Sequence, residues 1–137
     1  MNDNRCFIDS NIWLYAFIET GDVDKRQQAQ LLIQSSTPVI STQVINEVCI
    51  NLIRKVNFSE DQIRQLIASF YSNYKVQKLN QSTVLTATQL RESYALSFWD
   101  SIIVASALDA SLSYVYSEDM HDGLHILNQL HIINPFK

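Results

Sequence analysis

The stretch that decides the fold is Cys6-Phe7-Ile8-Asp9-Ser10-Asn11, near the start of this 137-residue chain. Its first three residues are apolar and stop abruptly at polar ones, which indicates a short buried strand followed directly by a helix start. We expect that helix to run from about Asn11 to Ile18. Asp9 therefore stands at the carboxyl end of a buried strand.

Short apolar runs and helical patterns alternate along the rest of the chain. Residues at helical spacing or at capping positions predict helices over 24–35, 42–56, 83–93 and 98–110. A capping box of Ser59 with Gln62 begins another helix. Short apolar or alternating runs predict further strands at 38–40, 75–79, 114–116 and 131–134. The pattern predicts an α/β fold in three layers, with a central parallel sheet of four to five strands flanked by helices.

Length and composition indicate one globular domain over residues 1–137, with 47% hydrophobic and 18% charged residues. The sequence has no apolar run of membrane-spanning length and no signal-peptide pattern, so we expect a cytoplasmic protein that does not enter a membrane. Cys6 and Cys49 each lie within an apolar stretch and are expected to be buried reduced thiols.

Three aspartates fall at or near the edge of the sheet where parallel α/β folds bind ligands. Asp9 ends the first strand, Asp119 follows the strand at 114–116 by a short turn, and Asp100 lies in the first turn of a helix. Each also has a purely structural interpretation. Asp9 and Asp119 are suited to turns, and Asp100 stands at capping-box spacing from Ser97.

Glu47 has a different setting, inside the helix expected over 42–56. The apolar residues of that helix form one stripe at helical spacing, and Glu47 points away from it. Periodicity alone therefore predicts a solvated surface glutamate.

Carboxylates that converge at such an edge repel one another unless cations lie between them. Clusters with oxygen ligands alone suit Mg²⁺ or Mn²⁺ better than zinc. The formal net charge is -4, and setting aside Asp9, Glu47, Asp100 and Asp119 leaves equal numbers of acidic and basic residues. The net negative charge is then that of the candidate site itself.

The sequence resembles the PIN-domain ribonucleases, and among them the VapC-type toxins of type II toxin–antitoxin pairs. The resemblance spans essentially the whole chain, through the segments FIDSNIWLYA, STQVINEV, SFWDSIIVASA, YVYSEDMHDG and INPF. The four acids of the family pattern fall on Asp9, Glu47, Asp100 and Asp119. The resemblance implies a metal-dependent endoribonuclease that hydrolyses RNA phosphodiester bonds with Mg²⁺ or Mn²⁺, with a small antitoxin protein as partner.

The resemblance also implies roles for individual residues. Asp9 and Asp100 bind the metal directly, and Asp119 joins them as a ligand or, with Glu47, completes the cluster or positions the water.

Three more residues support that site in the same interpretation. Asn11 is similar to a position that hydrogen-bonds within the site, and Ser117 to a hydroxyl that supports the fourth acid. Asp122 lies close enough to Asp119 in sequence to share or replace its role.

Two other functions remain open at this point. One is a non-catalytic PIN-like module that only binds RNA or protein. The other is a phosphohydrolase resembling the haloacid dehalogenases, with Asp9 as nucleophile, although those enzymes usually have a second aspartate where this chain has Asn11.

His121 and His125 are four residues apart, but with no third nitrogen or sulfur ligand evident they are interpreted as surface or loop histidines.

A homodimer or antitoxin surface is the second interpretation of Phe70, Tyr71 and Tyr74, for which core packing is favoured.

Overall fold

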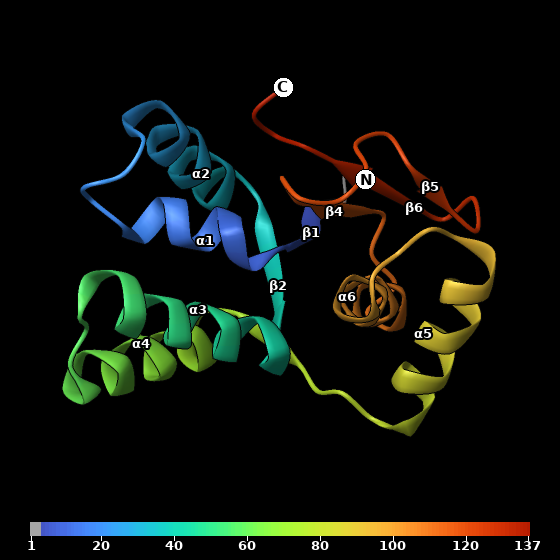
Figure 1. The fold of residues 1–137 in the computed structure, drawn as a ribbon, viewed down its shortest axis with the longest axis horizontal. Helices are drawn as coiled ribbons and strands as arrows, with labels where there is room; N and C mark the ends of the chain where they lie inside the picture. The colour runs from blue at the N-terminus through green and yellow to red at the C-terminus, as the bar shows by residue number, and fades with distance from the viewer. Residues whose placement is uncertain (1–3) are drawn as a thin grey trace.

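The computed structural model describes residues 4–137, in which six strands form one sheet of order β3-β2-β1-β4-β6-β5 (Figure 1). The strands are β1 (Arg5–Ile8), β2 (Thr37–Ser41), β3 (Lys75–Gln77), β4 (Tyr114–Tyr116), β5 (His125–Ile126) and β6 (Leu130–Ile133). The helices are α1 (Ser10–Phe17), α2 (Val23–Ser35), α3 (Thr42–Val56), α4 (Glu60–Asn73), α5 (Gln81–Ser93) and α6 (Phe98–Asp109).

The sheet is parallel except at the β5 edge. β1 pairs in parallel with both β2 and β4, and β5 alone runs antiparallel, against β6. From β1 the chain builds outward to β2 and β3 on one side and to β4 and β6 on the other. The strand order therefore reverses between β1 and β4, and the carboxyl ends of these two strands are the expected ligand edge.

Helices lie on both sides of β2, with α1 to α4 on one side and α5 and α6 on the other (Figure 1). The indole of Trp13 anchors the first group. It is 1% exposed, its Nε1 donates to the Ile8 carbonyl at 3.1 Å, and its ring meets those of Phe70 and Tyr74 edge-on at 5.3 and 5.2 Å. Core packing thus accounts for Phe70 and Tyr74, whereas Tyr71 is 54% exposed.

The predicted three-layer α/β fold is confirmed, with one strand more than the four to five expected. The extra strand, β5, has two residues and reaches β6 through Leu127 and Asn128, which adopt positive φ of 53° and 54°. Such a turn favours glycine, and without one the sequence carries no hairpin pattern. Of the helices formed by residues 4–137, none is long and apolar enough to span a bilayer.

Local capping explains where individual helices begin. Ser59 and Gln62 form the expected capping box of α4, each side chain accepting from the other residue's backbone N–H at 3.2 and 2.8 Å. A second capping box, of Asn80 with Thr83, starts α5 two residues before the predicted position. β3 ends at Gln77, two residues earlier than the sequence predicts.

Candidate active site

Asp9 lies at the junction of β1 and α1 and is held on both carboxylate oxygens. Oδ1 accepts from the Ser10 backbone N–H at 2.7 Å as the cap of α1, and Oδ2 accepts from Ser117 Oγ at 2.8 Å. The Asp9 backbone N–H donates to the Tyr116 carbonyl at the end of β4, at 2.9 Å. The residue is 6% exposed, so its cap and its strand pairing fix one carboxylate at the reversal point of the sheet.

Ser117 connects this carboxylate to the turn after β4. Its buried Oγ donates to Asp9 and accepts from the backbone N–H groups of Asp119 and Met120, both at 3.3 Å. The Asp119 side chain is exposed, yet it is near enough to Asp9 and Asp100 for its charge to raise the pKa of both. One hydroxyl therefore orders two elements of the candidate site.

Asp100 is half-buried in the first turn of α6. Ser97 caps this helix, because its Oγ accepts from the Asp100 backbone N–H at 3.1 Å. Burial raises the pKa of the Asp100 carboxyl, the Ser97 hydrogen bond lowers it, and the Asp119 charge raises it further. The first turn of α6 thus carries an acid whose charge also raises the pKa of Asp9 and Glu47.

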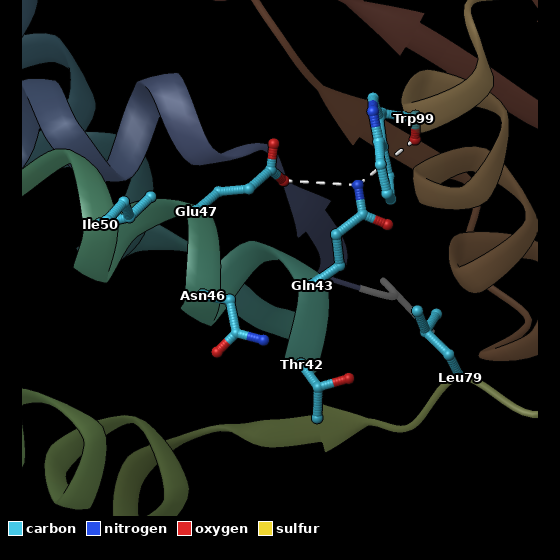
Figure 2. Close-up of a pocket in the computed structure, with 7 residues that line it drawn as sticks. All are labelled: Thr42, Gln43, Asn46, Glu47, Ile50, Leu79 and Trp99. Atoms are coloured by element: carbon cyan, nitrogen blue, oxygen red, sulfur yellow. Dashed lines mark hydrogen bonds between the residues drawn. The ribbon is translucent and has the colours of Figure 1, made fainter.

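Glu47 belongs to the same cluster, which overturns the prediction from periodicity alone that it is a solvated surface glutamate. It is half-buried, and burial raises its pKa to about 7, with further contributions from the charges of Asp9 and Asp100. Gln43 Nε2 donates to Glu47 Oε1 at 3.4 Å and to the Trp99 carbonyl at 3.4 Å (Figure 2). The polar face of α3 therefore points at the candidate site.

Both burial and neighbouring negative charges raise the pKa values within the cluster. Burial raises the pKa of Asp9 to about 6 in spite of its two hydrogen bonds, and the charges of Asp100 and Asp119 raise it further. For Asp9, Glu47 and Asp100, the charges that shift the pKa are all carboxylates. A divalent cation among them would relieve this repulsion and favour the ionised forms.

The donors at this edge are carboxylate oxygens, the chemistry that Mg²⁺ and Mn²⁺ prefer. Across residues 4–137, however, no three His, Cys, Asp or Glu side chains are placed so that they could hold a metal ion. The charges of these acids thus raise the pKa of neighbouring carboxyls, although the side chains form no closed ligand set.

The other predicted site residues have different settings. Asp122 Oδ1 accepts from the Asn134 backbone N–H at 2.7 Å, and the charge of Asp122 is not among the causes that shift the pKa of Asp9, Glu47 or Asp100. Asn11 has a buried amide whose two polar atoms have no hydrogen-bond partner among the described residues. The ring of His125 stacks on that of His131, with centroids 4.2 Å apart.

A cavity of about 510 Å³ opens beside Glu47, and sequence reasoning missed it. One face of α3 lines it together with one residue before α5 and one at the start of α6; the lining residues are Thr42, Gln43, Asn46, Glu47, Ile50, Leu79 and Trp99 (Figure 2). The spacing of Gln43 and Glu47, four residues apart on one helix face, could have indicated a shared site.

Comparisons with solved structures identify similar folds at low sequence identity. A toxin–antitoxin complex from Klebsiella pneumoniae has 20% identity and a TM-score of 0.71, covering 95% of this chain and 97% of that chain. VapC20 of Mycobacterium tuberculosis, a sarcin-ricin loop cleaving toxin, has 16% identity and a TM-score of 0.67 over 83% of this chain and 91% of that chain. VapBC2 of Rickettsia felis, solved with a DNA fragment from its promoter, has 17% identity and a TM-score of 0.65 over 93% and 96%.

At these identities the likeness establishes the fold alone, and no curated protein matches the sequence. The family is established by the sequence of the chain. Residues 6–121, which include all four acids of the cluster, match the model of the PIN domain, and the chain therefore belongs to the PIN domain family.

Proposed function

We propose that this protein is a metal-dependent endoribonuclease and the toxin of a type II toxin–antitoxin pair. Its PIN domain and its structural likeness to a toxin–antitoxin complex and to a toxin that cleaves the sarcin-ricin loop support this proposal. The proposed partners are an RNA substrate and a cognate antitoxin, with a homodimer as the assembly and the cytoplasm as the location.

The observation that carries the proposal is the coupling of four carboxylates from four parts of the chain. The charge of Asp100 raises the pKa of Asp9 and of Glu47, and the charge of Asp119 raises the pKa of Asp9 and of Asp100, with no positive charge among the causes of these shifts. Such an arrangement is costly for folding alone, which favours a functional origin.

We propose that Asp9, Asp100 and Asp119 would hold Mg²⁺ or Mn²⁺, and that the cation would draw their carboxylates closer together than they lie in the metal-free protein. When bound, the metal supplies a Lewis acid for the phosphate and lowers the pKa of a bound water. Ser10 and Ser117 hold the Asp9 carboxylate in place through their hydrogen bonds. Glu47, with its pKa of about 7, is suited to accept a proton from the attacking water near neutral pH.

The test combines RNA cleavage with metal binding. Asp9→Asn or Asp100→Asn should lower cleavage by about 10³-fold or more, since the metal contributes several kcal/mol to transition-state stabilisation. The matched control is Asp24→Asn, which changes an exposed aspartate in the first turn of α2. Excess chelator should abolish cleavage, and Mn²⁺ titration by calorimetry should show binding that Asp9→Asn removes.

A second candidate function, a PIN-like module that binds RNA or protein without cutting it, is favoured by the lack of a closed ligand set in the described residues. RNA binding without cleavage, together with no carboxylate-dependent uptake of Mn²⁺, would select this candidate. Cleavage that persists in excess chelator would instead reject the metal mechanism.

A further inference from the structure

We propose that the cavity beside Glu47 binds one unpaired nucleobase of the RNA substrate, with Trp99 as the stacking residue and the amides on α3 at the base edge. The inference rests on the proposed function for its ligand and adds how that ligand is recognised.

The cavity has the size and position of a substrate subsite. Its volume of about 510 Å³ lies within the range typical of small-molecule pockets. It shares Glu47 with the carboxylate cluster, and Trp99 directly precedes Asp100 in the chain. A group held in the cavity is therefore adjacent to the proposed reaction centre.

The chemistry of the lining favours a base over a phosphate. None of the seven lining residues is a lysine or arginine, and the one charged residue, Glu47, is an acid. An anionic phosphate would be repelled here, whereas a neutral heterocycle with apolar faces and polar edges matches the mixture of Ile50, Leu79, Trp99 and amide side chains.

Trp99 provides an exposed aromatic surface at the cavity wall. Its side chain is 61% exposed, although α6 is otherwise largely buried. The neighbouring Phe98 ring lies edge-on to it at 5.0 Å and is itself covered by the Arg91 guanidinium at 4.6 Å. Proteins that bind single-stranded RNA commonly stack bases on exposed aromatic rings.

Gln43, which also lines the cavity, supplies a second, independent observation. It is 9% exposed, its Nε2 donates to Glu47 and to the Trp99 carbonyl, and its Oε1 is buried without a hydrogen-bond partner in the described part of the chain. An unpaired buried acceptor is unfavourable, and a base N–H donor would satisfy it. The more exposed Asn46 amide, which Figure 2 shows on the same face of α3, offers both a donor and an acceptor.

The experiment uses five-nucleotide single-stranded RNAs and the Asp9→Asn protein, which should bind RNA without cutting it. The chain has two tryptophans, and Trp13 is buried, so a change in emission on binding reports Trp99. We expect quenching by oligonucleotides that carry bases and none by an abasic oligonucleotide of the same length.

Affinity is measured by the fluorescence anisotropy of labelled RNA. Trp99→Ala should weaken binding of the base-containing RNA by about tenfold, the effect of losing one stacked base, and leave the abasic RNA unchanged. Trp99→Phe should restore most of the affinity. Tyr114→Ala removes another exposed aromatic residue, on β4 and outside the cavity, and should have no effect.

Equal loss for base-containing and abasic RNA, or no loss for either, would overturn the base subsite. So would a Trp99→Ala protein whose homodimer dissociates while its RNA affinity is unchanged, because Trp99 would then belong to a protein interface. Failure of the proposed function looks different: the unsubstituted protein with Mn²⁺ would not cut RNA, although base-dependent quenching persisted.

Discussion

The two faces of α3 are built from adjacent residues and have opposite chemistry. On one face Val44, Val48 and Leu52 are fully buried in the core. On the other, Asn46 and Glu47 line the cavity and the carboxylate cluster. The first face contributes burial of apolar surface, whereas the second carries a half-buried acid whose pKa is raised to about 7.

The difference shows that one face of α3 contributes to the stability of the fold and the other to the chemistry of the candidate site. Apolar burial favours folding wherever it occurs, but a half-buried carboxylate close to other carboxylates opposes folding, because it loses solvation and is repelled by their charges. Substitutions on the first face should therefore change stability alone, and those on the second should change activity more than stability. Three substitutions and a pH series test this division, beginning with the largest expected effect.

Leu52→Ala tests the core face. Because the side chain is fully buried, its truncation should cost about 2–5 kcal/mol of the free energy of unfolding, through lost burial and a residual cavity. Urea unfolding measures this change, and RNA cleavage per folded molecule should stay the same. A loss of cleavage in the fully folded fraction would show that the two faces are not independent.

Glu47→Gln tests the opposite face with a substitution of similar shape. Loss of the carboxylate that we propose as proton acceptor should lower kcat by about 10²-fold. The free energy of unfolding should stay the same or rise, since the substitution removes a charge repelled by Asp9 and Asp100. A destabilisation as large as that of Leu52→Ala would mean that Glu47 is structural.

The sequence could predict the core face of α3 because apolar residues at helical spacing have one common cause, burial. The polar face has two possible causes, solvent and a site, and periodicity does not separate them. Only the resemblance to PIN-domain ribonucleases made Glu47 a candidate site residue. For Asp9 and Asp119, by contrast, the strand ends themselves predicted a shared edge, and Ser117 Oγ there donates to the Asp9 carboxylate and accepts from the Asp119 backbone N–H.

The pH dependence of stability tests the repulsion directly. In the metal-free protein the pKa of Asp9 is raised from 3.8 to about 6 and that of Glu47 from 4.5 to about 7. The folded state then binds more protons than the unfolded chain between about pH 4 and 7, so these groups stabilise the protein at low pH and lose this contribution as pH rises.

We expect Asp9 to account for a fall in the free energy of unfolding on the order of 2 kcal/mol between pH 4 and 8. The half-exposed Glu47 adds less, because solvent screens its charge. Urea unfolding across this range checks the fall, and Asp9→Asn should remove most of it. Stability that is equally pH-dependent in both proteins would contradict the repulsion.

The cavity beside Glu47 could not be predicted from the sequence for a related reason. Leu79 and Trp99 come from segments far from α3 in the chain, and they line the cavity only once α5 and α6 have packed. The sequence shows Trp99 simply as an aromatic residue before Asp100. Which side chains meet it depends on how the helices pack, and spacing along the chain does not encode that.

Gln43→Met is the finest test of the division, because Gln43 lines the cavity and yet is as buried as the core. Methionine has a similar volume and removes a buried acceptor that has no partner, but it also removes the two 3.4 Å hydrogen bonds that Nε2 donates, so stability should change by no more than about 1 kcal/mol. It also removes the hydrogen bond that lowers the Glu47 pKa, which should therefore rise further, as carboxyl NMR titration of the metal-free protein can measure. If instead the free energy of unfolding falls by more than about 1 kcal/mol, the polar contacts of Gln43 stabilise the fold, and Gln43 belongs with the core face of α3.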